Sequence, residues 1–266
     1  MTGYVITQNP QASAAVAGTD ERFPVRRIFC VGRNYAAHAR EMGFSDKEPP
    51  FFFTKPADAL VETGSTIPYP PITENLHYEI ELVLAIGTGG ANITPEDAIS
   101  HIWGAGVGID FTRRDQQIAH REKGRPWDWG KAFDNSAPLA PLVRIADLPA
   151  ERQSLAEGRI WLSVNGEIQQ DASLADQIWN VSDVIAFCSQ SVTLKAGDLI
   201  FTGTPAGVGA VTSGDVVTGG IESIGDIAIM RNRRAAHGKL TEKGLHIAHR
   251  RVALGSGGRI AHMSDR

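Results

Sequence analysis

The chain has 266 residues with 42% hydrophobic and 21% charged content and a formal net charge of −4, values that are ordinary for a soluble globular protein. It has no apolar stretch as long as a membrane span, and its first 20 residues lack the basic and apolar regions of a signal peptide. Cys30 and Cys188 are far apart and flanked by apolar residues, so we expect buried thiols in a reducing cytoplasm rather than a disulfide.

The prolines suggest where the chain divides. Six of the 14 prolines fall between Pro49 and Pro71. Proline at this density interrupts helices and confines strands to short or edge pieces. We therefore expect a small N-terminal unit over residues 1–71 and a main body over residues 72–230.

A strand rich in Ile, Leu and Val is predicted by the run YEIELVLAIG, from Tyr78 to Gly87. Residues i and i+2 of a strand point to the same face, so Glu79 and Glu81 are expected to crowd one spot. Two carboxylates beside an apolar run repel unless one is protonated or a cation lies between them. A pair of carboxylates favours a hard cation such as Mg²⁺ or Mn²⁺. The alternative is a solvated edge strand with two outward glutamates.

Two glycine-rich segments follow, GAGVGID (104–110) and TGTPAGVG (202–209). They lack the spacing of a dinucleotide fingerprint and of a P-loop, so we expect tight turns, and the N–H groups of the second could cradle a carboxylate. The apolar part of the first segment, GAGVGI, also fits a strand that ends at Asp110, where a third carboxylate could meet the glutamate pair. The alternative role of Asp110 is the N-cap of the next helix.

The remaining local signals are mostly β. A hairpin is predicted over residues 160–169, across the turn Asn165-Gly166. Further strands are predicted over 197–202, 215–218 and 227–230. Helices are predicted from Thr94 onward with Pro95 at the first position, over 112–123, and over 183–191. The expected fold is mainly β with short helices, in the α+β class.

The last segment, residues 231–266, differs in charge from the rest. It carries nine Lys and Arg against two Asp and Glu, a net charge of +7, whereas the remainder has a net charge of −11. A polyanion-binding appendage is one interpretation. A loosely ordered basic extension is the expected one, because Gly255 to Gly258 and scattered charges leave little to bury.

Six motifs occur in register along the chain: VGRNYAAHAREMG, PFFFTKPADAL, YEIEL, GIDFTRRDQQ, GRPWDWGKAFD and GDLIFTGTPAGVG. Together they resemble the fumarylacetoacetate hydrolase family, in particular its fumarylpyruvate and acylpyruvate hydrolase branch. The resemblance covers roughly residues 26–225 and leaves out the basic tail. It implies the mixed β-sandwich roll of that family, with a small N-terminal unit, and a homodimer.

The resemblance also implies the roles of particular residues. Glu79, Glu81 and Asp110 match the ligands of one divalent cation per chain, Mg²⁺ or Mn²⁺. The matches for the reacting groups and the substrate contacts are His38 and Glu41 as a general-base dyad on a lid-like segment, Lys131 as the active-site cation, and Arg33, Lys55, Arg114, Gln117 and Thr204 at the substrate.

Bland interpretations exist for these residues too. His38 and Glu41 are spaced i, i+3, which is usual for an exposed ion pair on a helix, and a lysine such as Lys131 is most often at the surface. Arg114 and Gln117 have the same spacing and could together hold a carboxylate and a carbonyl.

The activity implied is hydrolytic C–C cleavage of a small anionic 2,4-dioxo acid to pyruvate and a carboxylic acid, fumarate if the substrate is fumarylpyruvate. Decarboxylation of oxaloacetate, or isomerisation of a 2-oxo-enoate diacid, needs the same chelate but no attacking water. From a different class, the basic tail leaves open a polyanion-binding protein with a vestigial fold. No membrane is expected, and nucleic-acid binding is not favoured.

Overall fold

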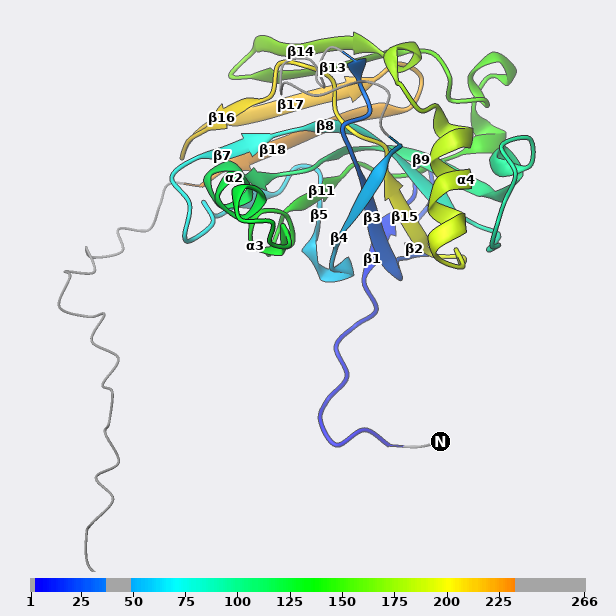
Figure 1. Ribbon diagram of the computed structural model, residues 1–266, viewed down its shortest axis with the longest axis horizontal. Helices are drawn as coiled ribbons and strands as arrows, with labels where there is room; N and C mark the ends of the chain where they lie inside the picture. The colour runs from blue at the N-terminus through cyan, green and yellow to red at the C-terminus, as the bar shows by residue number, and fades with distance from the viewer. Residues whose placement is uncertain (1–2, 37–48, 233–266) are drawn as a thin grey trace, which may run out of the picture. The chain divides into compact units, whose positions relative to one another are not determined.

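Alternating apolar segments form two packed β-sheets in the computed structural model, which describes residues 3–36 and 49–232 (Figure 1). The larger sheet has eight strands in the described residues, in the order β4-β3-β15-β8-β9-β11-β5, with β12 paired to β9. Its strands are β3 (Arg27–Gly32), β4 (Phe51–Lys55), β5 (Leu60–Glu62), β8 (Ile80–Ile86), β9 (Ile102–Ile109), β11 (Ala137–Leu139), β12 (Val143–Arg144) and β15 (Asp198–Phe201).

The second sheet has five strands in the order β14-β13-β17-β18-β6, and two small sheets complete the β-structure of the described residues. The five strands are β6 (Thr66–Ile67), β13 (Arg159–Val164), β14 (Glu167–Ser173), β17 (Val216–Ile221) and β18 (Gly225–Arg231). The small sheets contain β7 (Leu76–Tyr78), β10 (Thr112–Arg113) and β16 (Gly209–Val211), and β1 (Ser13–Ala15) with β2 (Arg22–Pro24).

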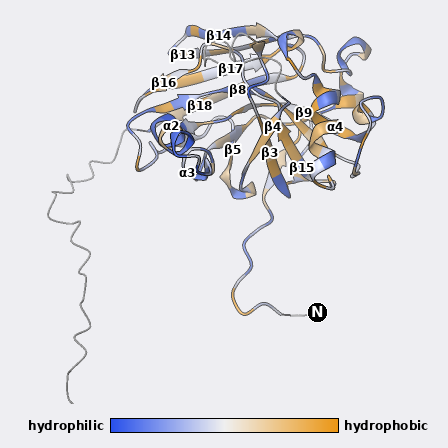
Figure 2. Ribbon diagram, in the orientation of Figure 1, coloured by the Kyte–Doolittle hydropathy of each residue, from blue (hydrophilic) through white to orange (hydrophobic). Residues whose placement is uncertain are grey.

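Helices are short in the described part of the chain. The α-helices are α2 (Arg114–Glu122), α3 (Asp128–Lys131) and α4 (Val181–Ser191). The 3₁₀ turns are η1 (Ala57–Ala59), η2 (Ala98–His101), η3 (Ile145–Asp147), η4 (Ala150–Arg152) and η5 (Leu174–Asp176). Helix α2 is strongly hydrophilic, whereas α4 carries apolar residues (Figure 2). The mainly β fold with short helices is confirmed.

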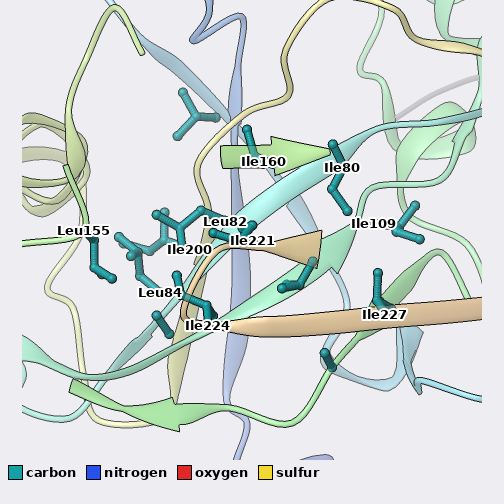
Figure 3. Close-up of a cluster of buried hydrophobic side chains, with 14 of the residues drawn as sticks. Ile80, Leu82, Leu84, Ile109, Leu155, Ile160, Ile200, Ile221, Ile224 and Ile227 are labelled. Carbon is teal, nitrogen blue, oxygen red and sulfur yellow. The ribbon is translucent and has the colours of Figure 1, made fainter. Parts of the chain in front are cut away.

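The main core lies between the two sheets. Ile80, Leu82 and Leu84 point from one face of β8 into this space and are fully buried. Apolar side chains of the second sheet and of neighbouring strands meet them there (Figure 3), including Ile160, Ile221 and Ile227. Each such buried side chain stabilises the fold by roughly 1.5–3 kcal/mol. These contacts help to fix the register of β8, because a slip of one residue would exchange the side chains on its two faces.

The opposite face of β8 is also buried, against a second apolar cluster. Val83 and Ala85 pack there with Leu199 and Phe201 of β15. Glu81 lies on this same face by the two-residue alternation of the strand. The residues that build the fold and those that could build a site are therefore neighbours on one strand.

Most predicted elements are found. The hairpin β13–β14 turns at Asn165 and Gly166, both with positive φ, 53° and 87°. The expected helix at Thr94 is wrong: residues 95–97 form a turn, and a 3₁₀ helix starts at Ala98. The Thr94 side chain accepts a hydrogen bond from the Asp97 N–H, as a helix cap would, but this bond closes only the turn.

The expected tight turn in GAGVGID is also wrong, and the strand expected over GAGVGI is found, because residues 104–109 belong to β9. Its glycines serve close packing instead. A Cβ added at Gly108 would lie 2.6 Å from the Phe201 ring and from Val83.

The N-terminal boundary near Pro71 stays a prediction. Strands β3 and β4, which precede it, pair into the larger sheet with β15, so sheet pairing crosses this boundary. The described residues belong to one compact unit, and the basic tail beyond Asn232 lies outside them. None of the helices among the described residues is long and apolar enough to cross a membrane.

Asp198 ties the start of β15 to β3. It is fully buried, and its carboxylate accepts from Arg27 Nη2 at 2.7 Å, Arg26 Nη1 at 3.1 Å and the Lys195 N–H at 2.9 Å. Asp198 and Arg27 are also direct partners in the parallel pairing of the two strands. The ion pair therefore fixes where this pairing begins.

We expect Asp198→Asn to lower the free energy of unfolding by about 2 kcal/mol, because two guanidinium groups lose a buried partner but remain partly solvated. Urea denaturation measures the change. Asp147→Asn is the matched control, since the Arg144–Asp147 pair is exposed and is expected to contribute less than about 0.5 kcal/mol. Equal stability of the two variants would contradict this account of Asp198.

Candidate functional site

Glu79 and Glu81 flank Ile80 at the junction of β7 and β8. Glu79 lies between the two strands, and Glu81 is the second residue of β8. Only 5% of Glu79 and 1% of Glu81 is exposed, so the solvated edge strand is wrong. The apolar partners of Ile80 and Leu82 hold the strand in the orientation that keeps both carboxylates inside.

Asp110 follows β9 directly and meets the glutamates. Its backbone N–H donates to the Glu79 carbonyl at 2.8 Å. Ligand oxygens of Glu79, Glu81 and Asp110 all lie within 4.8 Å of one another. The N-cap of helix α2 is Arg113, so the alternative role of Asp110 as its cap is wrong. The predicted meeting of three carboxylates is thus found.

Three cations surround these carboxylates. Lys131, from α3, places Nζ 2.7 Å from Glu79 Oε2 and 2.5 Å from Asp110 Oδ2. The Arg114 guanidinium pairs with Glu79, and the Lys55 Nζ lies 2.8 Å from Asp110 Oδ1. These cations compensate the cost of burying the charges of Glu79 and Asp110.

The charges and the burial change the pKa values within the cluster. Burial, with the charges of Asp110 and Glu79, raises the pKa of Glu81 well above its usual value. Burial alone would lower the pKa of Lys131, but Asp110 and Glu79 outweigh it and leave that pKa raised. Lys131 is therefore a charged ammonium. Only 3% of it is exposed, so the alternative that Lys131 is a surface lysine is wrong.

The loop after β15 closes the site on the side of Glu81. The Gly203 N–H donates to Glu81 Oε2 at 2.7 Å. Gly203 has φ 95°, and a Cβ there would lie 2.7 Å from the Asn34 Cβ, so glycine is required. The sequence predicted that N–H groups of residues 202–209 could bind a carboxylate. The Gly203 N–H does so, and the carboxylate is that of Glu81 in the same chain. Thr204 comes next in the loop and lines a small cavity together with Glu79 and Glu81.

A cavity of about 30 Å³ opens at the two glutamates. Its lining includes Glu79, Glu81 and Lys131, and Thr204 and Gln117 join them at its wall. A volume of this size holds about one water molecule or one ion.

A larger cavity of about 520 Å³ adjoins the small one. The two share Arg33, Phe51, Phe53, Trp127 and Lys131 in their linings. Phe51 and Trp127 meet edge to face, with ring centroids 5.3 Å apart, so the walls are flat and aromatic. Lys131 thus lies where the small cavity, which could hold one ion, meets the larger cavity, which could hold a small molecule.

Sequence reasoning missed these aromatic walls. Phe51, Phe53 and Trp127 come from segments more than 70 residues apart, and nothing local distinguishes them from core residues. Their membership in the PFFFTKPADAL and GRPWDWGKAFD motifs was the available signal.

The other expected substrate contacts differ in their surroundings. Arg114 donates to Gln117 Oε1 at 2.7 Å, so the predicted pair does share one helix face. Arg33 places its guanidinium 5.0 Å from the Phe51 ring centroid, at the wall of both cavities. Lys55 lies beneath the cluster, where Nζ also donates to the main-chain carbonyl of Phe111 at 3.2 Å. The substrate contacts stay predictions.

His38 and Glu41 fall within residues 37–48, outside the described part of the chain. The dyad therefore stays a prediction as well.

The residues present fit a hard divalent cation. All three candidate ligands are carboxylates, the donors that Mg²⁺ and Mn²⁺ prefer. Asp110 Oδ1 is buried and, within the described residues, accepts no hydrogen bond; its contact with Lys55 is an ion pair. A carboxylate oxygen has two lone pairs, so the ion pair with Lys55 leaves one of them for a metal ion.

Known proteins resemble the chain over most of its length. A fumarylpyruvate hydrolase of Ralstonia sp is 44% identical over 182 residues, 68% of this chain and 92% of that protein. An oxaloacetate tautomerase of Escherichia coli strain K12 is 41% identical over 196 residues, 74% of this chain and 88% of that protein.

A solved structure shows the same fold. The crystal structure of fumarylpyruvate hydrolase from Pseudomonas aeruginosa in complex with Mn²⁺ and pyruvate is 47% identical, with a TM-score of 0.83 over 87% of this chain and 100% of that one. The expected β-roll is thereby confirmed. The family model described as fumarylacetoacetate hydrolase C-terminal matches residues 27–233. The chain therefore belongs to the fumarylacetoacetate hydrolase family.

Proposed function

We propose that this protein is a metal-dependent hydrolase that cleaves a 2,4-dioxo acid, with fumarylpyruvate as its substrate, to pyruvate and a carboxylic acid. The observation that carries the proposal is the buried cluster of three carboxylates with Lys131 at its edge. The similarity to fumarylpyruvate hydrolases of Ralstonia and Pseudomonas aeruginosa supports this choice of substrate. We further propose that the protein acts as a homodimer in the cytoplasm.

In this reaction water adds its oxygen to C4, the C3–C4 bond breaks, and C3 receives a proton. A Mg²⁺ or Mn²⁺ ion held by Glu79, Glu81 and Asp110 would polarise the carboxylate and 2-oxo oxygens of the substrate. Lys131 would stabilise the negative charge of the departing pyruvate fragment, because its ammonium already faces the site as a cation. Arg114 and Gln117 would hold the substrate's carboxylate.

The attacking water needs a base, and we assign this role to His38 with Glu41 orienting its ring. The larger cavity supports a substrate with an acyl group beyond the pyruvate part. Its volume of about 520 Å³ and its walls of Phe51, Phe53 and Trp127 suit a flat, conjugated chain. Arg33 at the wall offers a cation to an acyl group that ends in a carboxylate.

Oxaloacetate tautomerisation is the second candidate, favoured by the similarity to the E. coli tautomerase. Conversion between the keto and enol forms moves a proton and breaks no C–C bond. Decarboxylation of oxaloacetate and isomerisation of a 2-oxo-enoate diacid likewise require no attacking water. All of these reactions would use the same carboxylates and Lys131. Hydrolysis differs from them because it also needs the dyad, to activate water, and the large cavity, to hold the acyl group.

A substrate panel separates these candidates. With Mn²⁺ present, we expect fumarylpyruvate to give the highest kcat/KM for pyruvate release, with acetylpyruvate at least about tenfold lower, because its methyl group leaves the aromatic cavity unfilled. Coupled lactate dehydrogenase assays measure pyruvate, and ultraviolet absorbance follows the enol form of oxaloacetate. Rapid loss of enol-oxaloacetate with no pyruvate from oxaloacetate or from either acylpyruvate would establish a tautomerase instead, and pyruvate from oxaloacetate alone would establish a decarboxylase.

Loss of one carboxylate tests the metal site. Glu81→Gln should weaken Mn²⁺ binding on the order of a hundredfold, since one of three anionic ligands becomes neutral. Titration calorimetry measures the dissociation constant, and Glu167→Gln, an exposed glutamate of β14, is the matched control with unchanged affinity. Excess EDTA should abolish turnover in the unaltered protein. Equal Mn²⁺ affinity in Glu81→Gln and the control would rule out this ligand set.

The dyad is tested by comparing two reactions. His38→Ala should lower acylpyruvate hydrolysis by roughly 10²–10⁴-fold, the usual contribution of a positioned base, and Glu41→Gln should lower it less. Mn²⁺ affinity should stay nearly intact, and any reaction of oxaloacetate should suffer less than hydrolysis. His101→Ala, on η2, is the control for loss of an imidazole. Hydrolysis retained in His38→Ala would show that the pair makes a structural contact.

A further inference from the structure

Gln170 is a buried polar residue that the proposed chemistry does not use. It lies on β14, where the residues on both sides of it along the strand are exposed, yet none of Gln170 is exposed. Its direct partner on β13 is Leu162, a fully buried core residue. Cross-strand partners point to the same face, so the Gln170 amide points into the space between the two sheets. A polar group in that space must be hydrogen-bonded to be tolerated.

The Gln170 amide bridges two segments of the candidate site. Its Oε1 accepts from the Ile80 N–H at 3.0 Å, between the two glutamates. Its Nε2 donates to Thr204 Oγ1 and to the Pro205 carbonyl, both at 2.8 Å. An amide N–H can only donate and a carbonyl can only accept, so Ile80 and Pro205 together fix which end of the amide is which.

This orientation determines the direction of the hydrogen bond at Thr204. Because Nε2 donates to Oγ1, the Thr204 hydroxyl must direct its own proton elsewhere. Thr204 lines the small cavity with Glu81 and Lys131, and within the described residues its hydroxyl proton has no acceptor. Thr204 is 3% exposed, so bulk water does not readily supply that acceptor. A ligand oxygen in the cavity can.

We propose that Gln170 is a positioning residue that makes the Thr204 hydroxyl an obligate hydrogen-bond donor to an anionic oxygen of a bound 2-oxo acid. The inference rests on the proposed function for the class of ligand. Gln170 acts through Thr204 and does not touch the ligand. A glutamine is required because both of its amide hydrogens and its oxygen are used at once.

A double-mutant cycle tests this role through binding rather than turnover. Calorimetry measures pyruvate binding to the Mn²⁺-loaded protein in Gln170→Met, Thr204→Val and the double variant. Each single change should weaken pyruvate binding about tenfold, the value of one hydrogen bond to a charged oxygen. The double variant should be no weaker than either single one, because both changes remove the same bond. Gln169→Met, the exposed neighbour on β14, is the matched control with unchanged binding.

A second variant separates the donor role from size. Gln170→Glu has nearly the same shape but an ionised carboxylate cannot donate, so the Thr204 proton would turn toward it and pyruvate binding should fall at least as far as in Gln170→Met. If Gln170→Met does not fold, as judged by its thermal unfolding, Gln170→Glu takes its place in the cycle. Mn²⁺ affinity without pyruvate should change less than about threefold in each variant.

Several results would overturn the proposal. Additive losses of about a hundredfold in the double variant would show that Gln170 acts independently of Thr204. Loss of Mn²⁺ affinity equal to the loss of pyruvate affinity would show a structural role in the strand that carries the glutamates. If the unaltered Mn²⁺-loaded protein does not bind pyruvate, the ligand class assigned to Thr204 is wrong. The proposed hydrolysis is judged separately, by pyruvate release from acylpyruvates.

Discussion

Three carboxylates and three cations buried in one place are the constraint on which the site depends. An isolated buried charge is strongly unfavourable, so Glu79, Glu81 and Asp110 can stay inside only with close partners. Lys131 contacts two of these carboxylates, and Arg114 and Lys55 contact one each. The short helices α2 and α3, which supply Arg114 and Lys131, therefore complete the interior as well as the site.

Strand β8 joins this constraint to the fold. One of its faces packs Ile80 and Leu82 against the second sheet, and the other presents Glu81. A register slip would move the Glu81 carboxylate into the apolar space between the two sheets, so the packing of the fold also holds the glutamates in place. Gln170 adds a link from the second sheet to the same strand. The three carboxylates thus lie in a strand or directly beside one, which suits the precise placement of ligands.

Features that depend on residues close together in the sequence could be predicted, whereas features that depend on distant segments could not. The two-residue spacing of Glu79 and Glu81 is local, and it correctly placed both on one face. The Asn165-Gly166 hairpin is equally local. The helix at Thr94 was wrong because a cap does not decide whether a helix continues. Gln170 was missed because its strand breaks the usual rule: the apolar Ile168 is exposed, whereas the polar Gln170 is buried opposite Leu162.

The central claim is that one divalent ion held by the three carboxylates enables cleavage of a 2,4-dioxo acid. The most direct measurement is a titration of metal-free protein with Mn²⁺, following bound metal and pyruvate release from fumarylpyruvate in the same samples. The account predicts no release without metal and a rate that rises in proportion to bound Mn²⁺ until one ion per chain is bound. Pyruvate release at an unchanged rate in metal-free protein would contradict it.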